Sequence, residues 1–286
     1  MEIQAPAKIN LYLAVIRKMD DGYHEIETLF ERISLFDRIF VDISPSETSI
    51  ECDDPRVPTE EDSLLGKTIS MFRKISGIEA QFKVRLEKNI PIGAGLGGGS
   101  SDAAALLKGL NEIVKQPLTR EQLIAIAKNL GADVPFFLED ASFARGSGRG
   151  DVTAPVSTDM KINHILINPP FEVSTKEVYR NVSDFNLTKD RGIDRMVSAF
   201  SKGKDINIII ENLRNDLQTI VLRGFPDVGH MFSELEKAGA KGVLLSGSGP
   251  TVFGVFEEDK VIEAEDVLRK RFSENEGWKV YAARTF

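Results

Sequence analysis

The chain has 286 residues, and at roughly 150 residues per domain this length favours two domains over one. Its 42% apolar and 28% charged residues form an ordinary globular composition, which argues against a disordered, collagen-like or disulfide-rich chain. With 36 basic and 44 acidic residues, the net charge of -8 disfavours a broad surface for nucleic acid or an anionic membrane. We therefore expect neither as a partner.

The cysteine content and the start of the chain predict a cytoplasmic protein. The single cysteine, Cys52, cannot form an internal disulfide, which fits a reducing compartment. Within the first twenty residues, the longest apolar run extends from Leu11 to Ile16, and it is too short for a signal peptide or a membrane span.

The first half of the chain alternates strand and helix patterns around a glycine-rich loop. We expect a strand pair bent around Pro6, and a helix that Asp62 or Ser63 caps and that ends before Gly77. Thr119 and Gln122 form the pattern of a capping box, which opens a further helix that Gly131 closes. The expected elements are strands at 2–16, 38–44 and 81–88, helices at 62–75, from about 100 to 114 and at 119–131, and a hairpin or domain crossing at 141–151.

The second half predicts helices packed on one side of an antiparallel sheet. Its expected strands are 161–168, 242–245, 251–256 and 278–282, and its expected helices are 175–181, 193–200, 206–222, one after Pro226, and 260–272. We place the domain boundary near residue 155. The fold class is therefore α+β, with an N-terminal mixed α/β domain at 1–155 and a C-terminal α+β sandwich at 156–286.

The segment from Pro91 to Ser101 carries the clearest chemical signal. Five glycines lie between residues 93 and 99, so backbone amides can approach an anion closely, and the following helix directs its positive end to the same place. This pattern predicts a polyphosphate site. Gly93, Gly95 and Gly98 also match a dinucleotide-binding fingerprint, although the acidic residue that should end the next strand is missing. A flexible turn without a ligand is a further alternative. A Walker A loop is excluded, because Ser100 and Ser101 follow the last glycine.

Three segments together resemble the GHMP small-molecule kinases, which include galactokinase, homoserine kinase and mevalonate kinase. They are Pro6–Leu11, the loop from Pro91 through Ser100-Ser101-Asp102-Ala103-Ala104, and Leu245–Thr251 with its Ser246-Gly247-Ser248-Gly249-Pro250 turn. Their order and spacing both match. The resemblance implies a two-domain GHMP kinase fold with a cleft between the domains, ATP as phosphate donor and Mg²⁺ with it.

Two further stretches narrow the resemblance to one branch of that family. They are Arg17–Thr28, which contains Gly22-Tyr23-His24, and Gly131–Phe137, which contains Gly131-Ala132-Asp133-Val134-Pro135. The branch phosphorylates the 2-hydroxyl of 4-diphosphocytidyl-2-C-methyl-D-erythritol in the non-mevalonate pathway to isoprenoid precursors. The resemblance therefore implies a small-molecule substrate carrying cytidine diphosphate, bound by a monomer or a weak homodimer.

The resemblance also implies a role for individual residues. Asp133 is the expected general base, and Lys8 is expected to pair with it. Without the resemblance, Asp133 would be interpreted as a helix-end aspartate and Lys8 as an edge-strand lysine. The expected substrate-binding residues are Asn10, Tyr23, His24, Thr175 and Tyr179, of which Tyr179 could equally be a helix-packing residue. The expected ATP-binding residues are Pro91, Gly93, Ala94, Gly95, Leu96, Gly97, Gly98, Gly99, Ser100 and Ser101. Ser100 and Ser101 are also the candidate hydroxyl neighbours of Mg²⁺, and no protein metal ligand is otherwise expected.

The chain departs from the family pattern at two places, and two other functions stay open. The segment Gly146–Asp151 is longer than expected, and Ser63 stands where an asparagine often precedes the helix by the adenine pocket. Another GHMP kinase, acting on homoserine or mevalonate, would leave Tyr23 and His24 without a function. A ligand sensor without turnover is disfavoured, because Lys8 and Asp133 are both present.

Overall fold

The computed structural model describes residues 1–182, 192–202, 205–273 and 276–286, and it divides the chain into two compact units. Unit 1 consists of Met1–Ala7, Leu35–Ile90 and Gly97–Asp140. Unit 2 consists of Lys8–Ser34, Pro91–Leu96 and Ala141–Phe286. Neither unit is continuous, because two long strands and the glycine-rich loop contribute residues to both. The domain boundary predicted from the sequence near residue 155 differs from this division into two units, and it stays a prediction.

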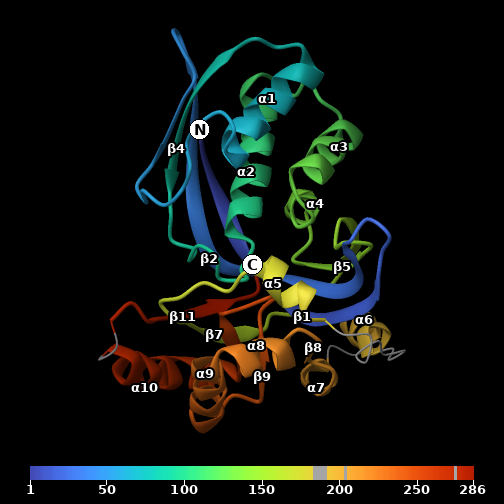
Figure 1. Ribbon diagram of the computed structural model, residues 1–286, viewed down its shortest axis with the longest axis vertical. Helices are drawn as coiled ribbons and strands as arrows, with labels where there is room; N and C mark the ends of the chain where they lie inside the picture. Colours follow the sequence, from blue (N-terminus) through green and yellow to red (C-terminus); the bar gives the residue numbers. More distant parts are fainter. Residues whose placement is uncertain (183–191, 203–204, 274–275) are drawn as a thin grey trace. The chain divides into compact units, whose positions relative to one another are not determined.

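Unit 1 is an α/β layer in which helices cover one face of a sheet (Figure 1). Its sheet contains the second half of β2 (His24–Ser44), with β4 (Gln81–Glu87) antiparallel to it and β3 (Ser49–Cys52) parallel to β4. The register pairs Val41 with Val84. The helices of unit 1 are α1 (Leu64–Ser76), α2 (Gly98–Ile113), α3 (Arg120–Leu130) and α4 (Val134–Leu138).

The helix ends of unit 1 follow local sequence signals. Ser63 caps α1 by accepting from the Gly66 amide, and Gly77 ends the helix in the left-handed conformation. Thr119 and Gln122 form both bonds of the predicted capping box of α3. These predictions are confirmed.

The first strand differs from the prediction of a bent pair. It is one continuous strand, β1 (Glu2–Lys18), and Pro6 lies within it. Proline is tolerated there because β1 has β2 on one side, whereas its other neighbour, β8 (Arg214–Asn215), pairs only with Tyr12 and Leu13.

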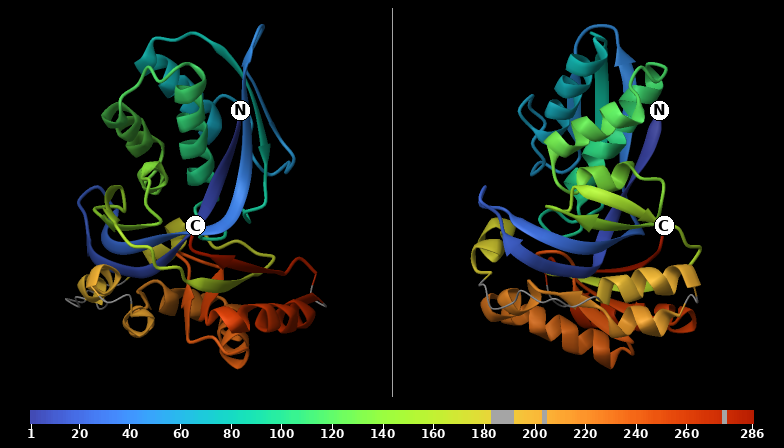
Figure 2. Two further views of the ribbon diagram at one scale, coloured as in Figure 1. Left: turned by 180° about the vertical axis from the view of Figure 1, so that it is seen from behind. Right: turned by 90° about the vertical axis from the view of Figure 1, so that its right-hand side faces the viewer.

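Unit 2 contains a four-stranded antiparallel sheet in the order β11-β7-β10-β9, with helices packed on one face (Figures 1 and 2). A hairpin of two further strands pairs with the first half of β2. The strands are β5 (Phe143–Ser147), β6 (Val152–Val156), β7 (Asn163–Asn168), β9 (Gly242–Leu245), β10 (Val252–Phe256) and β11 (Lys279–Arg284). The helices are α5 (Thr175–Arg180), α6 (Gly192–Lys202), α7 (Ile206–Glu211), α8 (Gln218–Gly224), α9 (Pro226–Lys237), η2 (Glu258–Lys260) and α10 (Val261–Ser273).

The α+β class predicted from the sequence is confirmed, but one predicted helix is wrong. The expected helix at 206–222 is split into α7 and α8, because the chain between them forms β8 and pairs with β1. The core of unit 2 joins β1 and β2 to β7 and to helices α9 and α10, through buried residues such as Leu13, Ile26, Ile165, Leu235 and Leu268. No helix in the described ranges is long and apolar enough to cross a bilayer.

Candidate functional site

The glycine-rich loop runs from the end of β4 to the start of α2. Helix α2 begins at Gly98, two residues earlier than predicted, because Gly97 adopts a left-handed conformation with a φ of 69° and serves as the N-cap. Gly98 and Gly99 therefore lie in the first turn, where amides have no intrahelical acceptor and can bind an anion.

The first part of the loop approaches the Ser246–Pro250 turn within unit 2. Ser246 Oγ donates to the Gly95 carbonyl at 3.0 Å, and the Thr251 amide donates to the Ala94 carbonyl at 3.4 Å. Gly95 has a φ of 76°, and a Cβ placed there would lie 2.2 Å from the Ser246 carbonyl oxygen. Only glycine fits this contact, so the two predicted motifs form one structure.

A buried asparagine that the sequence did not single out supports the same turn. Asn215 Nδ2 donates to the carbonyls of Leu245 and Gly247 at 2.8 and 2.7 Å. Its Oδ1 accepts from the Leu217 amide at 2.9 Å. Asn215 follows no recognisable motif, and its role depends on the pairing of β8 with β1, which brings it to the turn.

Lys8 and Asn10 lie side by side on β1, as the alternation of the strand predicted. Lys8 Nζ donates to Asn10 Oδ1 at 2.6 Å, Asn10 Nδ2 donates to Thr28 Oγ1 at 2.7 Å, and Thr28 Oγ1 donates to the Tyr12 carbonyl at 2.7 Å. Lys8 and Asn10 are only 4% and 1% exposed, so this chain of bonds fixes their orientation. A Cβ on Gly247 would lie 3.2 Å from Lys8 Nζ, which shows how closely the turn approaches it.

Asp133 lies in unit 1, directly before α4. It occupies the N-cap position, yet its side chain forms no capping hydrogen bond with that helix. Asp133 as a residue is half-buried. The helix-end location is thus as the bare sequence suggested, but the side chain is not used as a cap.

An aromatic group in unit 2 contains the predicted base-binding residues. The rings of His24 and Tyr179 lie 5.3 Å apart, and Tyr23 is 56% exposed. Burial and the nearby Lys18 lower the pKa of His24, so its imidazole is neutral at neutral pH. Tyr179 also packs partly against the core of unit 2, so both of its expected roles are compatible with its position.

Arg149 extends this aromatic group, and the sequence indicated it only through an unusual loop. Its guanidinium lies 4.2 Å from the centre of the Tyr23 ring and bonds to Asp21 Oδ2 at 2.9 Å. Asp21 Oδ1 accepts from the Tyr23 amide at 3.0 Å. Asp21 and Arg149 together therefore hold Tyr23, and Arg149 covers one face of the ring.

Thr175 and the two loop serines have different surroundings. Thr175 is exposed, and its Oγ1 lies 2.7 Å from Ser248 Oγ, so the predicted substrate contact begins α5 beside the Ser246–Pro250 turn. Ser101 Oγ is buried and has no hydrogen-bond partner among the described residues, whereas Ser100 is half-buried. Within those residues, no group of three or more histidine, cysteine, aspartate or glutamate side chains could hold a metal ion.

Comparisons with known proteins identify the family of this chain. The family model described as GHMP kinases N terminal domain matches residues 63–140, and the one described as GHMP kinases C terminal matches residues 196–274. A 4-diphosphocytidyl-2-C-methyl-D-erythritol kinase from Desulfotalea psychrophila is 37% identical over 99% of this chain and 95% of its own. A kinase of the same name from Syntrophus aciditrophicus is 38% identical over 100% of this chain and 99% of its own.

Solved structures give the same result. A crystal structure of a 4-(cytidine 5'-diphospho)-2C-methyl-D-erythritol kinase superposes with a TM-score of 0.83 at 33% identity, covering 99% of this chain and 98% of that one. A homoserine kinase from Cytophaga hutchinsonii shares the fold, with a TM-score of 0.77 at 19% identity over 99% of this chain and 94% of that one. The dinucleotide alternative for the glycine-rich loop is therefore wrong. The chain belongs to the GHMP kinase family, within the branch of the 4-diphosphocytidyl-2-C-methyl-D-erythritol kinases.

Proposed function

We propose that this chain transfers the γ-phosphoryl group of ATP to the 2-hydroxyl of 4-diphosphocytidyl-2-C-methyl-D-erythritol. This is a step of the non-mevalonate pathway to isoprenoid precursors, and it is the activity for which the relatives in this branch are named. The observation that carries the substrate assignment is the aromatic group of Tyr23, His24 and Tyr179. Neither homoserine nor mevalonate has a base that such a group could stack on.

In this proposal, the carboxylate of Asp133 accepts the proton of the substrate's 2-hydroxyl group. The oxygen of that hydroxyl attacks the γ-phosphorus of ATP, and ADP leaves. Lys8 stabilises the attacking oxygen and keeps Asp133 ionised, and Asn10 holds a substrate hydroxyl. The fixed chain from Lys8 through Asn10 to Thr28 supports these roles, because an oriented group loses little entropy when substrate binds. The pairing of Lys8 with Asp133 stays a prediction of the family resemblance.

The glycine-rich loop is assigned to the phosphates of ATP. Two observations fit a phosphate ligand there. They are the helix N-terminus at Gly98 and the buried hydroxyl of Ser101, which has no hydrogen-bond partner in the part of the chain that the structure describes. When bound with ATP, Mg²⁺ neutralises charge that develops on the phosphate oxygens. Ser100 and Ser101 are the hydroxyls proposed to lie near it.

The aromatic group is assigned to the cytosine of the substrate. The neutral His24 imidazole can hydrogen-bond the edge of the base, and Tyr23 and Tyr179 can stack on its faces. Since Arg149 already covers one face of Tyr23, the base is expected on the other face. Thr175 supplies a polar contact nearby.

The cytoplasmic location of the protein and its state as a monomer or weak homodimer also remain proposals.

The test is a coupled assay of ADP release with the purified full-length chain and three substrates in parallel. We expect turnover with 4-diphosphocytidyl-2-C-methyl-D-erythritol and background rates with homoserine and mevalonate. The product should gain one phosphoryl group at the 2-position, which phosphorus NMR would locate. Turnover with homoserine or mevalonate, and none with the cytidyl substrate, would overturn the proposal.

A further inference from the structure

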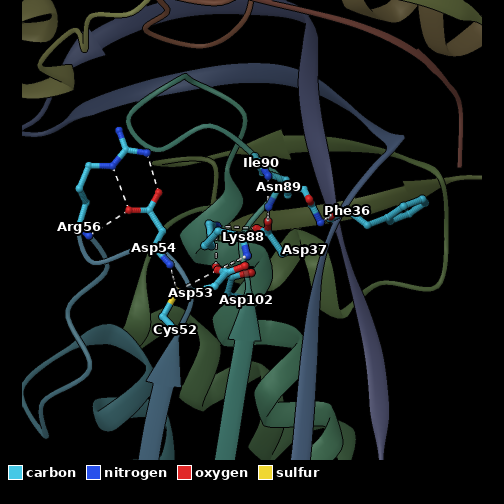
Figure 3. Close-up of polar contacts among 10 residues, drawn as sticks. All are labelled: Phe36, Asp37, Cys52, Asp53, Asp54, Arg56, Lys88, Asn89, Ile90 and Asp102. Carbon is cyan, nitrogen blue, oxygen red and sulfur yellow. Dashed lines mark hydrogen bonds and ion pairs between the residues drawn. The ribbon is translucent and has the colours of Figure 1, made fainter. Parts of the chain in front are cut away.

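A buried carboxylate holds the backbone where the glycine-rich loop begins. Asp37, on β2 in unit 1, is fully buried. Its Oδ1 accepts from the amides of Asn89 and Ile90 at 2.6 and 2.8 Å, and its Oδ2 accepts from Lys88 Nζ (Figure 3). The amide of Lys88 donates to Asp53 Oδ1 at 2.9 Å. Two carboxylates therefore fix the consecutive amides of residues 88, 89 and 90.

Lys88 connects this start of the loop to the helix that follows it. Besides Asp37, Lys88 Nζ donates to Asp102 Oδ2 at 2.9 Å, and Asp102 lies in the first part of α2. The side chains of Lys88, Asp37 and Asp102 are 5%, 0% and 4% exposed. All of them belong to unit 1, as do Ile90 and Gly97, where the chain leaves and re-enters that unit.

The ammonium of Lys88, directly after β4, lies between two buried carboxyl groups, those of Asp37 on β2 and Asp102 on α2. Burial alone would lower the pKa of Lys88, but Asp102 and Asp37 raise it, so the ammonium stays charged. Asp53 contacts the same segment through the backbone amide of Lys88.

We propose that Asp37 is a positioning residue for the phosphate-binding loop: it fixes the amides at the start of the loop and, through Lys88 and Asp102, the first turn of α2. This inference rests on the proposed function, in which the loop binds ATP. Asp37 is fully buried, so it acts on the loop through the backbone amides of Asn89 and Ile90 and through the ammonium of Lys88.

The physical reason lies in the glycine content of the loop. Glycines give amides close access to phosphates, but they also leave the backbone free to adopt many conformations. Ordering such a loop on binding lowers affinity, and fixing its two ends beforehand reduces that cost. Loosening the ends should therefore weaken ATP binding, while the groups at the reacting hydroxyl are unchanged.

The experiment compares Asp37→Asn with the wild type and with Asp42→Asn. Asp42 lies on the same strand with its side chain 73% exposed, so it is a matched control. In Asp37→Asn, we expect the KM and Kd for ATP to rise by about tenfold, the cost of reordering about one backbone residue. The kcat and the KM for the cytidyl substrate should change by less than about twofold, and Asp42→Asn should match the wild type.

Two outcomes separate this inference from the proposed function. If wild-type protein binds ATP and Asp37→Asn binds it equally well, the positioning role of Asp37 is wrong. If the wild type binds no ATP, the proposed function fails instead.

A second pair of variants covers the case in which Asp37→Asn does not fold. Asp102→Ala removes the link from Lys88 to α2 but leaves the Lys88–Asp37 ion pair intact. We expect a higher KM for ATP in Asp102→Ala and its return to near the wild-type value in Asp102→Asn, whose amide oxygen can still accept the hydrogen bond from Lys88. An equal KM for ATP in both variants and the wild type would overturn the inference.

Discussion

Gly95 offers the sharpest test of how the glycine-rich loop is built. A Cβ at this position would lie 2.2 Å from the Ser246 carbonyl oxygen and 3.0 Å from the Gly249 carbonyl oxygen. Real Cβ contacts almost never fall below 3.0 Å, so the loop or the turn must retreat by about 0.8 Å, the difference between 3.0 and 2.2 Å. Because both contacts are backbone atoms, a rotamer change cannot relieve the clash.

We therefore expect Gly95→Ala to misplace the amides that bind the phosphates. A displacement of about 1 Å can cost up to about 100-fold in rate, so kcat/KM for ATP should fall by about 10- to 100-fold. The left-handed backbone adds a stability cost of about 1 to 2 kcal/mol for alanine. Steady-state kinetics with ATP varied, together with urea unfolding, would measure both effects.

Gly77→Ala is the matched control. Gly77 has a φ of 70°, close to the 76° of Gly95, but nothing lies within 4 Å of its added Cβ. It should lose the same stability of about 1 to 2 kcal/mol while its kcat/KM for ATP stays unchanged. If Gly95→Ala were no worse for ATP than Gly77→Ala, the close approach of the loop to the Ser246–Pro250 turn would have no functional meaning.

Four further outcomes can be measured. Asp133→Asn should keep the melting temperature but lose turnover, because an amide cannot accept the substrate proton; near wild-type kcat would exclude Asp133 as the base. Tyr23→Ala should raise the KM for the cytidyl substrate by about 5- to 150-fold, from about 1 to 3 kcal/mol of stacking, and a rise in the KM for ATP instead would contradict the site assignment. Since the pKa of His24 is lowered from 6.5, any rise of that KM on acidification should have its midpoint below pH 6.5, and a midpoint at or above pH 6.5 would contradict the lowered pKa. Burial and Asp37 raise the pKa of Asp102 in the folded chain to about 8, above the ordinary 3.8, so the free energy of unfolding should fall as pH rises between these two values. Urea unfolding at several pH values would measure this, and the same pH dependence of the free energy of unfolding in wild type and Asp102→Asn would refute it.

The features that the sequence predicted correctly are those with local causes. Ser63 and Gly77 at the ends of α1, and Thr119 and Gln122 before α3, act on backbone groups a few residues away, so their spacing along the chain is sufficient. The glycine-rich loop was found for the same reason. Its helix begins earlier than expected because Gly97 provides the N-cap without any capping side chain.

The features that the sequence did not predict depend on distant partners. The sequence pattern at 206–222 fits one helix, but pairing of Arg214 with Tyr12 on β1 places part of it in a strand. Lys88 and Asp37 are 51 residues apart, and no spacing rule connects them. Arg149 reaches Tyr23 from the turn between β5 and β6, so its role becomes visible only in three dimensions.

The interleaved composition of unit 2 has a consequence for the order in which the chain is made. Residues 8–34 belong to this unit, but the partners of some of them are synthesised much later: Arg214 on β8 pairs with Tyr12, and Thr285 pairs with Ile33. Until then, part of β1 and β2 has an unpaired edge and exposed apolar side chains such as Leu13 and Ile26. Unit 2 can therefore complete these β-sheet contacts only after residues 214 and 285 have been synthesised, long after β1 and β2.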